Sequence, residues 1–154
     1  MARYEDAGDE VITMLDNIKE SYFPELRAAK FKVFFDTKKK TSGGKFVLAR
    51  ISKTNDLQRY LTVDESGSDF GYDYFLYLDL LVWYNSTEAD QSKILQHELF
   101  HTLVDMEKDN PYGIQGHEVE TFYDEIERCK DDSRWAERLS AVAESLYERE
   151  KNRK

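Results

Sequence analysis

The stretch YDYFLYLDLLVWYNSTEADQSKILQHELFHTLVDME, residues 72–107, decides the fold, because a strand, a break and a helix follow one another in it. Residues 72–84 predict a strand, and their apolar side chains fall on both faces, which is typical of a strand that is largely buried or that a helix covers on its second side. The break at 85–87 ends with Thr87, a good helix cap, and Asp90 behind it favours the start of a helix. We therefore expect a helix over 88–107.

This helix is amphipathic. At about 100° per residue, one face carries apolar side chains, and the opposite face carries polar ones with Ile94 among them. The first set is Leu95, Leu99, Leu103 and Met106; the second is His97, Glu98, His101 and Asp105. We expect the leucine face to pack on the sheet and the polar face to line a cleft.

The polar face contains the segment His97-Glu98-Leu99-Phe100-His101. Two His four residues apart project from one side of a helix, so both imidazoles can bind one ion at about 2.0–2.1 Å, the Zn–N distance. Glu98 falls beside such an ion, where it can take a proton from a bound water. Two surface His and a Glu are the alternative, but the strand, cap and helix around them favour a Zn²⁺ site.

Catalytic zinc usually has three protein ligands and one open position. The chain has three His, and the third, His117, follows the turn at 110–113. We predict His117 as the third ligand, with Glu118 and Glu120 as alternatives. Asp105, Glu120 or Asp124 could accept a hydrogen bond from the second ring nitrogen of a ligand imidazole and so orient it.

The rest of the chain predicts a mixed architecture in one domain, 1–154. Helical spacing is found at 6–21, 117–130 and 132–151, with a short helix at 56–62, and strands are indicated at 31–35 and 46–51 with a turn at 41–44. The prediction is an α+β fold: an N-terminal helix, a small three-stranded mainly antiparallel sheet, the helix that carries His97, and two C-terminal helices.

Charge and composition exclude several classes. The net charge is −9, and the only basic cluster, Lys38–Lys40 with Lys45, is expected at a hairpin tip, which argues against nucleic-acid binding by this chain alone. The single Cys129 allows no disulfide within the chain and is expected as a buried thiol. We expect no signal peptide in residues 1–10, which are charged and lack an apolar core, and the apolar stretch 75–83 is too short to span a bilayer. We expect a cytoplasmic protein without membrane contact.

The residues from Ala49 to Trp135 resemble the phage metallopeptidase family, which looks like a small relative of the SprT-like zinc proteases. The matching segments are 49–52, 72–76, Trp83, 95–101 and 116–122. The resemblance implies a zincin-like fold, His117 as the third ligand, and the host bacterium's cytoplasm as the compartment. Glu118 stands where the family usually has Asp, a difference that leaves His117 in place.

These observations together predict a zinc-dependent metallopeptidase that cleaves a protein or peptide substrate. Zinc on His97, His101 and His117 would activate its bound water, with Glu98 as general base. Tyr112 or Tyr123 could complete the oxyanion site, and the substrate could pair with an exposed sheet edge. The alternatives are a non-catalytic, zinc-stabilised binding module, a SprT-like protease acting on DNA-associated proteins, and an enzyme that hydrolyses a non-peptide amide.

Overall fold

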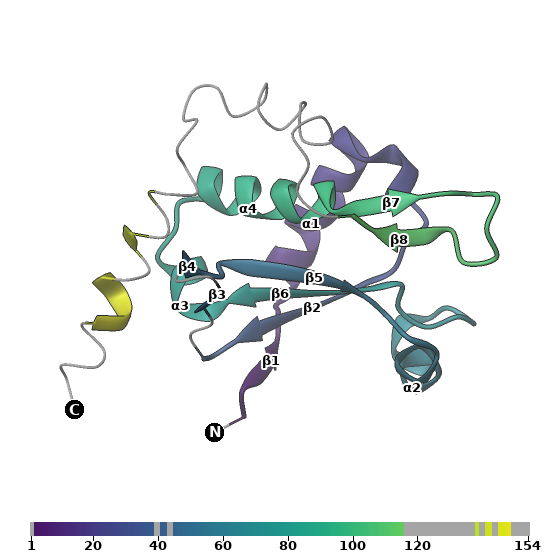
Figure 1. The fold of residues 1–154 in the computed structure, drawn as a ribbon, viewed down its shortest axis with the longest axis horizontal. Coiled ribbons are helices and arrows are strands. Elements are labelled where there is room, and N and C mark those ends of the chain that lie inside the picture. The colour runs from purple at the N-terminus through teal and green to yellow at the C-terminus, as the bar shows by residue number, and fades with distance from the viewer. Residues whose placement is uncertain are drawn as a thin grey trace.

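The fold is built on a mixed sheet. The computed structural model describes residues 2–38, 41–42, 45–115, 138, 141–142 and 145–148. These residues form a four-stranded sheet of order β1-β2-β6-β5 (Figure 1). β2 (Phe31–Asp36) and β6 (Tyr74–Asp79) are parallel, and β1 (Tyr4–Asp6) and β5 (Ala49–Lys53) are the antiparallel edges.

The α+β class is confirmed, but the expectation of three strands is wrong. The missed strand, β1, is three residues long and exposed throughout, so it has no apolar alternation to reveal it. A tertiary contact holds it in place: the Arg3 guanidinium donates to both carboxylate oxygens of Asp36, at 3.1 and 3.0 Å. Two of the three strand pairs are antiparallel, as expected.

The helices are α1 (Asp9–Tyr22), α2 (Asp56–Ser66), α3 (Leu80–Tyr84) and α4 (Glu88–Phe100), with a 3-10 turn η1 (Pro24–Leu26) after α1. Two small hairpins complete the described elements: β3 (Thr41–Ser42) with β4 (Lys45–Phe46), and β7 (Thr102–Val104) with β8 (Tyr112–Ile114). Neither hairpin joins the central sheet. No described helix is long and apolar enough to cross a membrane.

The core lies between one face of the sheet and the helices α1 and α4. Figure 1 shows α4 above β5 and running alongside it, with α1 crossing behind. The buried side chains that meet there include Leu15 of α1, Val33 of β2, Leu76 of β6, and Leu95 and Leu99 of α4. Complete burial of each such side chain contributes about 1.5–3 kcal/mol, so this contact fixes α4 on the sheet.

The opposite face of the sheet is aromatic. Phe34 stacks on Tyr77 with ring centroids 5.4 Å apart, Tyr4 and Phe75 contact this pair, and the Arg50 guanidinium lies 3.7 Å over the Tyr77 ring. The second apolar face of β6 is therefore covered by neighbouring aromatic rings. Of the two alternatives that the sequence left open, the largely buried strand is the one observed, since five of the six residues of β6 are buried.

The predicted strand 72–84 ends early. β6 stops at Asp79, whose carboxylate accepts a hydrogen bond from the Val82 amide at 3.0 Å and so caps α3. The helix prediction 88–107 also overshoots, because α4 stops at Phe100. Leu95 and Leu99 are fully buried as expected, whereas Leu103 and Met106 are 50% and 75% exposed.

The C-terminal part is described at a few positions. The expected helix at 117–130 lies outside the described residues. Within 132–151, residues 138, 141–142 and 145–148 are helical. Arg138 binds both carboxylate oxygens of Asp90 in α4, at 3.0 and 2.7 Å, and the Tyr147 hydroxyl donates to Asp79 at 2.5 Å. These contacts join the chain's end to the starts of α3 and α4.

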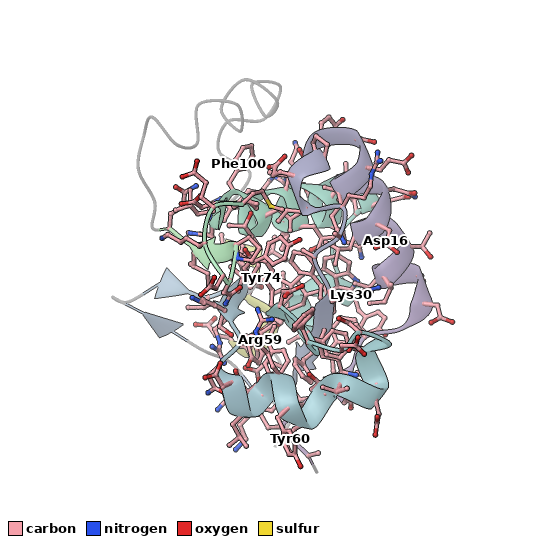
Figure 2. All side chains as sticks on the ribbon, turned by 90° about the vertical axis from the view of Figure 1, so that its right-hand side faces the viewer. Asp16, Lys30, Arg59, Tyr60, Tyr74 and Phe100 are labelled. Carbon is pink, nitrogen blue, oxygen red and sulfur yellow. The ribbon has the colours of Figure 1, made fainter. Side chains whose placement is uncertain are left out.

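α2 is anchored by its ends and by Arg59. Asn55 and Gln58 form a capping box at its start. Arg59 binds Asp73 at 3.0 Å and Asn110 at 3.2 Å, and Figure 2 shows Arg59 directed toward the body of the molecule while Tyr60 points away. Gly71 packs on the same turn, since a Cβ there would lie 2.2 Å from the Arg59 carbonyl oxygen.

Substitution of Gly71 should therefore separate a clash from simple backbone strain. Gly67 and Gly71 have nearly the same positive φ, 69° and 72°, but a Cβ at Gly67 meets nothing within 4 Å. We expect Gly67→Ala to cost about 1–2 kcal/mol of unfolding free energy. Gly71→Ala should cost about 3 kcal/mol or more, because overpacking adds to the strain. Urea unfolding measures both, and equal losses would contradict the role of the close approach.

The Asp90–Arg138 pair should make stability depend on acid. Hydrogen bonds from Arg138 lower the pKa of Asp90, burial opposes this, and the Arg138 charge adds to the lowering. The pair's contribution is then fully present above the ordinary Asp pKa of about 3.9. It is lost as pH falls through the lower pKa of the folded state.

We expect Asp90→Asn to reduce the unfolding free energy by about 1–2 kcal/mol at pH 7, since Arg138 is partly exposed. The difference from the wild type should shrink as pH falls below the ordinary Asp pKa and vanish once the pH is below the lowered pKa of Asp90 in the folded state. The exposed Asp64 is the control, and Asp64→Asn should change little at either pH. A difference that persists in acid would show that the charge of Asp90 is not what matters.

Candidate metal centre

α4 is positioned by its cap and its buried face. The Thr87 hydroxyl accepts a hydrogen bond from the Asp90 amide at 3.2 Å, which starts the helix where the sequence predicts it. Leu95 and Leu99 then fix the rotation of the helix, because both are fully buried. This rotation places residues 97, 98 and 101 on a different side of the helix from Leu95 and Leu99.

His97, Glu98 and His101 come together on that side. Each offers one ligand atom, and these atoms all lie within 4.8 Å of one another. The imidazole rings are 5.2 Å apart at 80° to each other. Both His side chains are half-buried, and Glu98 is 6% exposed. The three predicted residues are thus adjacent in space.

His101 directly follows the last residue of this helix and is not an interior position. It is the C-cap of α4, and its amide donates to the Glu98 carbonyl at 3.1 Å. The Thr102 hydroxyl closes the turn on the Leu99 carbonyl at 2.6 Å. The chain then leaves as β7, so the second imidazole sits where a helix changes into a hairpin.

Gln115 holds this junction, although it was not among the predicted site residues. The backbone amide of Gln115 donates to the backbone carbonyl of His101 at 2.6 Å, and the backbone carbonyl oxygen of Gln115 lies 2.8 Å from His101 Nδ1. Its side-chain amide donates to the carbonyls of Phe100 and Thr102 at 3.0 and 3.3 Å. Only the unpredicted hairpin brings residue 115 back to 101, so no sequence signal marked it.

The contact between Gln115 and His101 selects a tautomer. A carbonyl oxygen only accepts, so Nδ1 carries the proton and donates it to Gln115. In the neutral ring, Nε2 is then the nitrogen that can coordinate a metal ion. This is the arrangement in which a ligand His is both oriented and kept neutral at the coordinating nitrogen.

The hairpin itself is tied to the sheet by Tyr74. This fully buried residue of β6 donates its hydroxyl proton to the Gly113 carbonyl at 2.9 Å, and its ring meets Tyr112 at 6.0 Å. Burial raises the pKa of the Tyr74 phenol, with a further contribution from Asp73, so the hydroxyl stays a donor. Tyr74 therefore positions β8, and through it the carbonyl of Gln115.

The other predicted positions are distributed as follows. Tyr112 is half-buried on β8, the second strand of the hairpin that follows His101. Asp105 lies in the hairpin connection, where its carboxylate accepts from the Glu107 amide at 3.1 Å. The remaining candidates lie outside the described residues: His117, Glu118, Glu120, Tyr123, Asp124 and Cys129.

The donor set fits a metal ion such as zinc. Two imidazoles about one helical turn apart offer ligand nitrogens of the kind that zinc favours. An adjacent carboxylate that is not itself a ligand leaves one coordination position of the ion for a water. Of the residues that the structure describes, His97, Glu98 and His101 form the cluster that can hold an ion.

Comparison with known families gives one match. The family described as "Putative phage metallopeptidase" matches residues 2–147. The chain belongs to this family. No curated protein and no solved structure shows significant similarity to it. Membership makes the chain a metallopeptidase at a coarse level, implies a bound metal, and confirms the resemblance drawn from the sequence.

Gln115→Leu should weaken metal binding without touching a ligand. The substitution leaves the Phe100 and Thr102 carbonyls without their amide donor, so the end of α4 loosens around His101. Loss of an outer contact of this kind typically costs about 10–100-fold in metal affinity. Competition with a chromophoric chelator measures the zinc dissociation constant.

The matched control is Gln91→Leu. Gln91 also donates its side-chain amide to a backbone carbonyl, that of Trp83 at 2.8 Å, but from the first half of α4. It should lower stability by a similar amount and leave zinc affinity unchanged. Equal zinc affinities for the two variants would remove Gln115 from the site.

Proposed function

We propose that this protein is a zinc-dependent peptidase in which His97 and His101 hold the ion and Glu98 is the general base. The observation that carries the proposal is the cluster of these three side chains at the end of α4, with ligand atoms within 4.8 Å. Family membership supports the peptidase class. The hydrogen bond from His101 Nδ1 supports Nε2 as a ligand atom.

The third ligand in this proposal is His117. The described chain reaches Gln115, whose carbonyl contacts His101, and His117 follows two residues later. The chain has three His, and a catalytic zinc usually takes three protein ligands, which also favours His117. Glu118 and Glu120 remain the alternatives.

When bound, zinc supplies a Lewis acid that acidifies a water and polarises the scissile carbonyl. The chain supplies the proton transfers. The Glu98 carboxylate accepts the proton of the attacking water and delivers it to the leaving nitrogen. Because Glu98 is 6% exposed, bulk water competes little for this proton. Tyr112 is the described candidate for stabilising the oxyanion.

The substrate in this proposal is an extended peptide on β5. β5 is one of the two edges of the central sheet among the described residues, and it lies next to α4 and β8. An added strand would satisfy the unpaired backbone groups of β5 and run past the metal centre. The side chains of β5 would then read alternate residues of the substrate.

Glu98→Gln tests the base directly. Gln keeps the size of the side chain but cannot take a proton, so kcat/KM on a peptide library should fall by about 10²–10⁴-fold. Zinc content should stay at the wild-type level. Glu88→Gln, an exposed acid in the first turn of the same helix, is the control and should cleave normally. Full activity in Glu98→Gln would exclude Glu98 as the base.

The same assay separates a peptidase from a non-catalytic zinc module. In a peptidase, a chelator abolishes cleavage and added zinc restores it. In a module, wild type and Glu98→Gln are equally inactive toward every peptide, and chelation lowers only stability. That second outcome would overturn the proposal.

A further inference from the structure

A hollow between α1 and the beginning of β2 has the properties of a small-molecule site. Its volume is about 450 Å³. Pockets for small ligands are usually of this size, with apolar walls and a few placed polar groups. Ile12, Leu15, Phe31 and Val33 supply the apolar wall. The described lining includes no residue of α4 or of the β7–β8 hairpin.

Lys19 is the buried charge of this hollow. It is 8% exposed, and its ammonium donates one hydrogen bond, to the Ala29 carbonyl at 2.9 Å. It also lies 5.0 Å from the Phe31 ring centroid. An ammonium has three donors, so two remain for another acceptor.

The charge of Lys19 is poorly compensated by the chain. The carboxylate paired with it is that of Asp16, 4.0 Å away and 64% exposed. Burial lowers the pKa of Lys19, the charge of Asp16 opposes this, the positive charge of Lys30 lowers it again, and the charge of Asp73 gives a smaller increase. An anion in the hollow would supply the partner that a buried cation needs.

Arg27 and Lys30 add positive charge at the rim. Both are exposed, and their side chains make no ion pair with a described residue. Figure 2 looks onto this side of the molecule and shows Asp16 on α1 with Lys30 between it and Tyr74. Lys32 differs, because Glu65 and Asp6 already bind its ammonium. Three cations are thus available in a chain of net charge −9.

We propose that this hollow binds a small organic carboxylate, with the carboxylate on Lys19 and an apolar body of about amino-acid size on the partly exposed side chains of Ile12 and Phe31. The two spare donors of Lys19 suit a carboxylate, and charge-assisted hydrogen bonds in a desolvated place are strong. The apolar wall favours an organic anion over inorganic phosphate. The site is independent of the metal centre and of the proposed hydrolysis.

Calorimetric titration of the full chain tests this with three probes: N-acetylleucine, N-acetylleucinamide and inorganic phosphate. N-acetylleucine should bind, and the uncharged amide should bind at least about tenfold more weakly. Phosphate should also bind more weakly, because it leaves the apolar wall hydrated. All titrations are repeated in His97→Ala, where binding through the metal centre is removed and binding in the hollow should persist.

Three variants locate the site. Lys19→Met keeps the length of the side chain and should weaken N-acetylleucine binding about tenfold. Because Lys19 also supports the contact with Ala29, Arg27→Gln and Lys30→Gln serve as surface variants that leave the core intact. Each should weaken binding by about threefold, the effect of losing one partly screened charge.

Lys53→Gln is the control for net charge, since Lys53 is exposed and outside the hollow. It should leave affinity unchanged. The proposal is overturned if the amide or phosphate binds as tightly as the acid, if binding disappears in His97→Ala, or if Lys53→Gln weakens it as much as Lys30→Gln.

Discussion

The contact between His101 and Gln115 is the constraint on which the candidate site depends. It ends α4, closes the β7–β8 hairpin and fixes one imidazole, all within a few hydrogen bonds. Tyr74 extends this constraint to the sheet through Gly113. The second imidazole, His97, lies inside the helix whose rotation Leu95 and Leu99 fix by their burial. The candidate site therefore combines an imidazole placed by a helix with one placed at the junction of a helix and a hairpin.

The sequence predicted the parts of the fold that depend on local periodicity. The cap at Thr87, the burial of Leu95 and Leu99, and the clustering of His97, Glu98 and His101 all follow from helical spacing. The helix end did not, because Leu103 and Met106 continue the apolar period although the chain has already turned into β7. β1 was missed for a related reason: its place is set by Arg3 and Asp36, which are distant in sequence.

Asp79 shows how one polar residue changes the reading of an apolar run. Within 72–84 it looks like an interruption of a strand, whereas it ends the strand and caps a helix. Burial raises its pKa, and hydrogen bonds from Tyr147 and Val82 act against this. A buried carboxylate with these donors is a structural group. It lies one residue from the fully packed Leu78 of the core.

Hydrogen bonds made by residues near both ends of the sequence determine the smallest fragment that should be expressed. Arg138 and Tyr147 satisfy carboxylates that sit at the starts of α4 and α3, and Arg3 does the same for Asp36 at the other end. A fragment that lacks Arg3, Arg138 or Tyr147 would keep the three residues of the metal cluster. It would leave the carboxylate of Asp36, Asp90 or Asp79 without this donor. The family match, residues 2–147, spans the same set of contacts. Shortened versions made for crystallisation should therefore start before Arg3 and stop after Tyr147.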